Sequence, residues 1–102
     1  MHINYSVEDD NLYFYLIGEL DQHYSKGVKE YLDRILDDVK GYNNVIFNLS
    51  DLTFMDSTGI GVMLGRYKKI KKIGAKCYIE NPTLNVEKVL ELSGIYEVIN
   101  KI

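Results

Sequence analysis

The chain has 102 residues, which is the usual size of one domain and is enough for one hydrophobic core without disulfides or metal ions. Hydrophobic residues make up 46% of it and charged residues 26%, so its composition is globular and not disordered. The net charge of −3 gives no overall attraction to nucleic acid and no apolar stretch is long enough to span a membrane, so neither is expected as a direct partner.

The single cysteine, Cys77, excludes an internal disulfide, and its apolar surroundings predict a small buried side chain and not a reactive thiol. The first ten residues lack the basic segment and apolar run of a signal peptide. We therefore expect a cytoplasmic protein that forms a single domain over residues 1–102.

The N-terminal residues predict a β-hairpin. Ile3, Tyr5 and Val7 alternate with polar residues, which is typical of a strand with one buried face. The apolar segment 12–17 predicts a more central strand. A polar turn at 8–11 separates the two, so we expect them to pair antiparallel.

The following segment predicts a helix after Asp21, a residue type that suits the N-cap position. Its apolar residues recur at the spacing of one helical face: Val28, Tyr31, Leu32, Ile35 and Val39. Gly41 is expected to end this helix, because glycine is favoured just after a helix C-terminus.

The middle of the chain predicts a strand, a loop and a second helix. Residues 44–49 form an apolar run typical of a buried strand, and residues 50–56 read as a connecting loop. The second helix is expected over residues 57–73, because Gly74 follows it.

The last part of the chain predicts a strand at 76–80 and a helix that starts at Asn81 and Pro82, since Asn caps helices and Pro suits the first helical position. A short strand is predicted at 96–99. The order β-β-α-β-α-β-α-β predicts an α/β fold with packed helices and a mixed, mainly parallel sheet that has an antiparallel N-terminal edge hairpin.

The segment 54–69, FMDSTGIGVMLGRYKK, carries the most information about function. At about 100° per residue, one face of its helix gathers the apolar side chains. This predicted core face consists of Ile60, Met63, Leu64, Tyr67 and Ile70.

On the predicted exposed face, Gly61 and Gly65 lie directly above Ser57, with Thr58 and Val62 beside them. Each glycine inside a helix costs about 1 kcal/mol relative to alanine. Two glycines on a solvent face therefore favour a role in which another surface lies close against the helix backbone. Val62, beside them, would then be an apolar contact for that surface.

Two plainer interpretations stay open at this point. Asp56, Ser57 and Thr58 could be only an N-cap cluster, since these residue types are preferred there. The glycines could equally pack against a loop of the same chain.

Ser57 is also a candidate phosphorylation site. A phosphoryl group adds about −1.5 to −2 charges near neutral pH. The macrodipole and free N–H groups at a helix N-terminus favour that charge, whereas the neighbouring Asp56 opposes it. We expect the fold to tolerate the modification, and its effect to fall on whatever docks over the glycines.

These residues resemble a known signature. The sequence DSTG at 56–59, followed by Gly61 and Gly65, is similar to the motif of the STAS domain family, the anti-sigma factor antagonists. The sequence GELD at 18–21 also resembles that family's motif after the second strand. The order of predicted elements agrees with the family over nearly the whole chain.

Within that family, the stretch 54–76 is most similar to the stand-alone sporulation antagonists, and GRYK at 65–68 fits them better than the general-stress antagonists. One departure is that the sequence ends at Ile102, where such members usually continue into a further helix.

The resemblance implies regulation by binding and not catalysis. The unphosphorylated chain would bind an anti-sigma factor that is also a serine kinase, so that the sigma factor is released. The kinase, which would hold ATP or ADP, would phosphorylate Ser57 and let go, and a serine phosphatase would restore the chain. Besides Ser57, the predicted partner-binding residues are Asp21, which rests mainly on the resemblance, and Asp56, Thr58, Gly61, Val62 and Gly65. No cofactor or metal site is expected.

Other functions have less support in the residues. A nucleophilic Ser57 would need a base in reach, yet the only histidines are His2 and His23, and no G-x-S-x-G motif is present. A dinucleotide site would need its glycines directly after a strand, whereas the predicted strand ends near Leu49. A non-switching interaction module of the same family, or a general-stress antagonist, stays open as an alternative.

Overall fold

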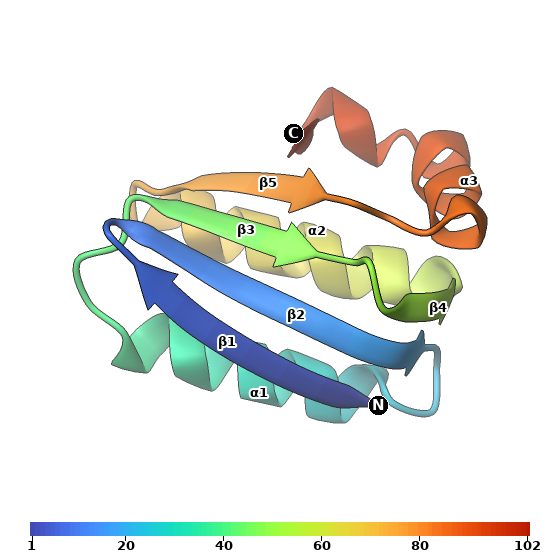
Figure 1. Ribbon diagram of the computed structural model, residues 1–102, viewed down its shortest axis with the longest axis horizontal. Coiled ribbons are helices and arrows are strands. Elements are labelled where there is room, and N and C mark those ends of the chain that lie inside the picture. Colours follow the sequence, from blue (N-terminus) through green and yellow to red (C-terminus); the bar gives the residue numbers. More distant parts are fainter.

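The computed structural model describes all 102 residues and shows a six-stranded mixed sheet with two helices on one face (Figure 1). The strand order is β1-β2-β3-β5-β6, and β4 pairs with β2 beyond the end of β3. In chain order the elements are β1 (His2–Glu8), β2 (Asn11–Leu20), α1 (Ser25–Asp38), β3 (Asn44–Asn48), β4 (Leu52–Met55), α2 (Ser57–Lys72), β5 (Lys76–Glu80), α3 (Leu84–Ser93), a 3₁₀-helix at Ile95–Glu97 and β6 (Asn100–Lys101). None of the helices is both long and apolar enough to cross a membrane.

The predicted α/β fold and its edge hairpin are confirmed. β1 pairs antiparallel with β2, whereas the pairs β2–β3, β3–β5 and β5–β6 are parallel. Ile3 lies opposite Leu16 and Tyr5 lies opposite Phe14, so the apolar residues of β1 share the face that the helices cover. Tyr5 and Val7 are nevertheless 44% and 48% exposed, because β1 is the edge of the sheet.

The core fills the space between the sheet and the pair α1 and α2. Phe14 and Phe47 stack at its centre with ring centroids 5.5 Å apart. Burial of each such side chain contributes about 1.5 to 3 kcal/mol to stability. The predicted burial of Cys77 is also confirmed, and this desolvation raises the pKa of its thiol to about 12.

The residues predicted to form a loop at 50–56 contain a strand instead. β4 has only four residues, of which Leu52 and Met55 are buried. It forms because β2 is longer than β3: the register shifts after Gly18, and the last residues of β2 then pair with β4. Gly18 has a φ of 108°, which suits glycine at such a shift.

Three element ends also differ from the predictions. α1 ends at Asp38, because Val39 adopts an extended backbone, and Gly41 makes the turn that follows. α3 begins at Leu84 and not at Asn81, whose φ of 51° is left-handed. The strand predicted at 96–99 is displaced: a 3₁₀-helix comes first, and β6 follows at Asn100–Lys101.

Candidate functional site

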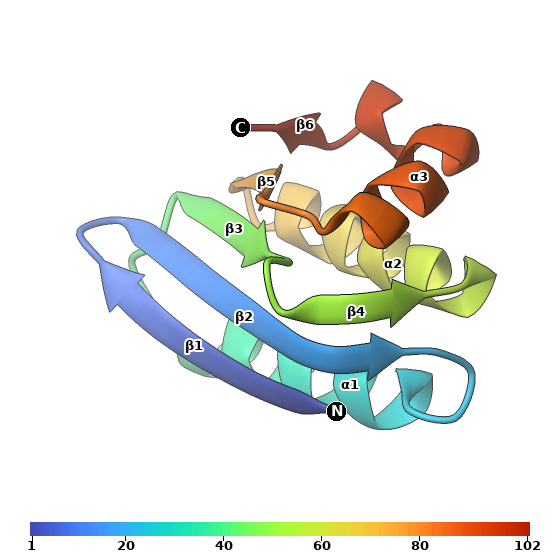
Figure 2. The same cartoon turned by 45° about the vertical axis from the view of Figure 1, so that its right-hand side comes forward.

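The first turn of α2 follows directly on β4, next to the end of β2 (Figure 2). Asp56 is the N-cap, and its Oδ1 accepts hydrogen bonds from the backbone N–H groups of Thr58 at 3.0 Å and Gly59 at 3.2 Å. The predicted N-cap cluster therefore exists in part: Asp56 caps the helix and the Thr58 hydroxyl donates to its carboxylate. The exposed Ser57 hydroxyl, at the first helical position, takes no part in the capping.

The carboxyl group of Asp56 is stabilised in its ionised form. The Thr58 hydroxyl donates to it and lowers its pKa, against the opposing effect of partial burial, and the backbone N–H groups of Gly59, Gln22 and Thr58 lower the pKa further. The position next to Ser57 thus carries a fixed negative charge at neutral pH, partly offset by the positive end of the α2 dipole.

The turn before α1 is tied to this same carboxyl group. Oδ2 of Asp56 accepts the backbone N–H of Gln22 at 3.3 Å. Asp21 is not the N-cap of α1, because that helix begins at Ser25; its Oδ1 instead accepts the N–H of Tyr24 at 3.1 Å within the preceding turn. The two segments singled out in the sequence, 18–21 and 56–59, are therefore neighbours in space.

The glycines of α2 have different roles. A Cβ atom on Gly59 would lie 2.7 Å from Met55 Cγ and 2.9 Å from the Leu20 carbonyl oxygen, so packing requires glycine there. A Cβ atom on Gly61 or Gly65 would meet nothing within 4 Å. These two glycines do not pack against a loop of the same chain, and the space above them is open.

The side of α2 next to Gly61 is more buried than predicted. Val62 is only 7% exposed, so it belongs to the core and offers little to a partner. The reason is that α1 packs alongside α2 and covers this sector of the helix. Arg66, which is 6% exposed, is held there by an ion pair of 2.8 Å between its Nε and Asp33 Oδ1. The predicted core face holds for Ile60, Met63 and Ile70, which are buried, and for Leu64 and Tyr67, which are half-buried.

A groove of about 430 Å³ runs between α1 and α2, from their first turns as far as Arg66. Its α2 wall consists of Thr58, Gly61, Val62, Gly65 and Arg66, and its α1 wall of Ser25, Lys26 and Lys29. Four of the six predicted partner-binding residues therefore line one groove, although Val62 contributes little exposed surface to it. Asp21 and Asp56 lie outside its lining.

Sequence reasoning missed the α1 wall and one apolar residue. Lys26 could have pointed to the α1 wall, because the helix macrodipole disfavours a cation in the first turn and a lysine there calls for another explanation. Phe54, three residues before Ser57 on β4, was not singled out either and is 46% exposed. A single exposed apolar side chain is normal on a protein surface, so it does not by itself mark an interaction surface.

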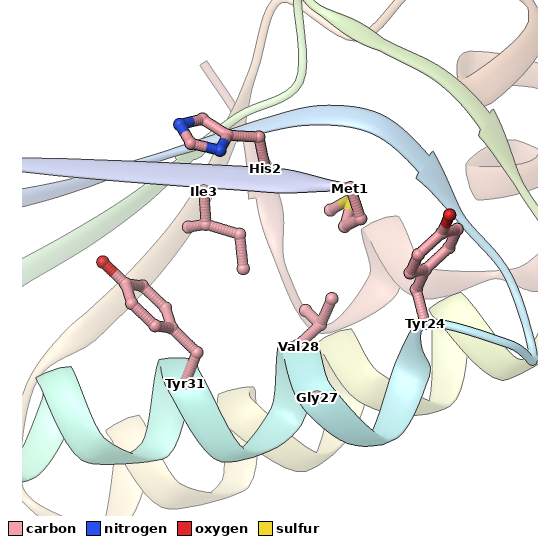
Figure 3. Close-up of a pocket in the computed structure, with 7 residues that line it drawn as sticks. All are labelled: Met1, His2, Ile3, Tyr24, Gly27, Val28 and Tyr31. Atoms are coloured by element: carbon pink, nitrogen blue, oxygen red, sulfur yellow. The ribbon is translucent and has the colours of Figure 1, made fainter.

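A second hollow, of about 350 Å³, lies between β1 and the other flank of α1 (Figure 3). Ile3 and Val28 point toward each other across it, whereas His2 points away. The pocket is mostly apolar and shares no residue with the head of α2. None of the predicted partner-binding residues lines it, so the groove is the better candidate.

Residues 2–102 match the family model of the STAS domain. This chain belongs to the STAS domain family. Among curated relatives, it is 35% identical over 83 residues to the anti-sigma F factor antagonist of Paenibacillus polymyxa. The aligned residues cover 81% of this chain and 70% of that protein. It is 28% identical over 102 residues to the anti-sigma-B factor antagonist of Bacillus subtilis, which covers 98% of this chain and 91% of the relative.

A solved STAS structure agrees with the fold described above. The anti-sigma factor antagonist SpoIIAA in its unphosphorylated form superimposes with a TM-score of 0.81 at 25% identity, over 99% of this chain and 88% of that one. The STAS family membership expected from the motif at 56–65 is thus confirmed.

Proposed function

We propose that this STAS domain is an anti-sigma factor antagonist whose partner docks at the head of α2. The observation that carries the proposal is the open space above Gly61 and Gly65, beside the exposed Ser57. Glycine is unfavourable in a helix, and nothing within the chain requires it at these two positions. A partner surface that lies directly against the helix backbone would explain why both positions are glycine.

The relatives supply the kind of partner. Proteins similar to this chain include antagonists of anti-sigma F and of anti-sigma-B factors. By this analogy the unmodified chain binds an anti-sigma factor in the cytoplasm. The anti-sigma factor then releases the sigma factor that it had held. The chain acts by binding, not catalysis. The 35% identity to an anti-sigma F factor antagonist favours the sporulation type over the general-stress type.

Phosphorylation of Ser57 by the anti-sigma factor, acting as a serine kinase that holds the nucleotide, is the proposed off-switch. The Ser57 side chain is exposed and free of capping, so a kinase has access to it. The helix dipole favours a phosphoryl group there, so the fold survives. The added charge stands beside the ionised Asp56 at the rim of the docking surface, where it opposes rebinding. A serine phosphatase reverses the step.

The deciding experiment incubates the chain with ATP and the anti-sigma factor encoded in the same genome, followed by intact-mass spectrometry and peptide mapping. We expect a gain of one phosphoryl group at Ser57 and none in Ser57→Ala. Binding without any phosphorylation, by a kinase active on another substrate, would instead identify a non-switching interaction module.

A further inference from the structure

Ion pairs join the C-terminal halves of α1 and α2, which lie side by side (Figure 1). Arg66 Nε lies 2.8 Å from Asp33 Oδ1, and Lys69 Nζ lies 2.9 Å from Asp37 Oδ1. Asp33 and Asp37 are one helical turn apart on α1. In this half of the interface, two α1 carboxylates each meet an α2 cation.

The pattern breaks toward the N-terminal ends of the two helices. One and two turns before Asp33, α1 presents Lys29 and Lys26, and the facing wall of α2 presents Gly61 and Gly65. Both lysines are exposed and neither takes part in an ion pair in the structure. No carboxylate lines the groove between them and the glycines.

These lysines are poorly explained by stability. Cations near a helix N-terminus are opposed by the macrodipole, and Lys26 lies in the first turn of α1. The α1 wall of the groove therefore holds two unpaired positive charges, and the α2 wall leaves open space above Gly61 and Gly65, where a Cβ would meet nothing within 4 Å. Arg66, the other cation in the lining, is already paired with Asp33. A group that fits both walls is small in cross-section and negatively charged.

We propose that an acidic side chain of the anti-sigma factor enters this groove over Gly61 and Gly65 and pairs with Lys26 and Lys29. Its carboxylate continues the row of ion pairs begun by Asp33 and Asp37. The inference rests on the proposed function and extends it: α1 supplies half of the docking surface, and its lysines select an acidic partner segment.

Isothermal titration with the anti-sigma factor encoded in the same genome tests the proposal. The groove variant is Lys26→Glu/Lys29→Glu. The matched control is Lys76→Glu/Lys88→Glu, which makes the same change in charge at exposed residues of β5 and α3, outside the groove and away from the glycine face of α2. We expect the groove variant to weaken binding roughly 30-fold or more and the control about 3-fold or less. Added NaCl should weaken wild-type binding much more than binding of the groove variant.

Two results would overturn the proposal: equal losses in both variants, which would show an effect of overall charge alone, or no loss in the groove variant. Failure of the unmodified wild-type chain to bind would overturn the proposed function, and this inference with it. The substituted lysines are all exposed and take part in no ion pair, and glutamate at position 26 is favoured in the first turn of α1, so both variants should fold; thermal melting checks this. Lys26→Gln/Lys29→Gln should give an intermediate loss of binding.

Discussion

Oδ2 of Asp56 accepts a hydrogen bond from the backbone N–H of Gln22 at 3.3 Å, across 34 residues of sequence. The other oxygen of the same carboxyl group caps α2 through Thr58 and Gly59. One side chain therefore fixes both the helix that carries Ser57 and the turn that leads into α1, so the two walls of the groove are positioned by a shared contact.

Replacement of Asp56 by alanine should destabilise the chain by about 1 to 2 kcal/mol, because a helix cap and the link to Gln22 are lost together. Ser57→Ala is the matched control and should change stability by less than about 0.5 kcal/mol, since this exposed side chain does not cap the helix. Urea unfolding at pH 7 measures both. Equal stability of the two variants would show that Asp56 does not act as the cap.

Stability should also depend on pH through Asp56. Its pKa in the folded chain is lowered from the ordinary value, so the carboxyl group stabilises the fold above about pH 3.9. That contribution is lost as pH falls through the lower, folded-state pKa. Asp56→Asn should therefore flatten the acid limb of a plot of unfolding free energy against pH, measured with urea from pH 6 to 2. An Asp56 carboxyl group that titrates by NMR above pH 4 would contradict this prediction.

Two neighbouring glycines should respond in opposite ways to alanine. Gly59→Ala should cost about 1 to 3 kcal/mol, because its Cβ would press on Met55 and on the Leu20 carbonyl oxygen. Gly61→Ala should stabilise the chain by up to about 1 kcal/mol, since the helix gains and nothing is crowded.

Gly61→Leu should fold but lose binding to the anti-sigma factor, because its side chain fills the space above α2. Thermal melting and titration separate the two effects. Normal binding by Gly61→Leu would exclude this surface as the docking site.

The ion pair of Arg66 should matter more than that of Lys69. Asp33→Ala leaves the buried Arg66 guanidinium without its partner and should cost about 2 to 3 kcal/mol. Asp37→Ala breaks an exposed pair and should cost less than about 1 kcal/mol. Double-mutant cycles with Arg66→Met and Lys69→Met measure each coupling, and similar coupling energies would show that burial makes no difference here.

Ser57→Ala should bind the anti-sigma factor and stay bound when ATP is added, whereas the wild-type chain should be released. Surface plasmon resonance with an ATP injection follows both directly. Release of Ser57→Ala by ATP would place the switch at another residue.

Local patterns were sufficient to predict α2, because its cap, its apolar face and the glycine after it all lie within one segment. They were insufficient for β4, which is too short to show a period and forms only because β2 outlasts β3. The burial of Val62 likewise depends on α1, a helix distant in sequence. For the same reason the α2 wall of the groove was predicted and the α1 wall, with Lys26 and Lys29, was not.

The open space above Gly61 and Gly65 has a consequence for laboratory evolution. A library selected only for thermal tolerance should accumulate alanine or larger residues at these two positions, because each gains helix stability without crowding any neighbour. Such a selection would enrich well-folded proteins that no longer recognise their partner. If a second library, selected for binding to the partner, kept both glycines, this would show that partner binding and not folding requires them.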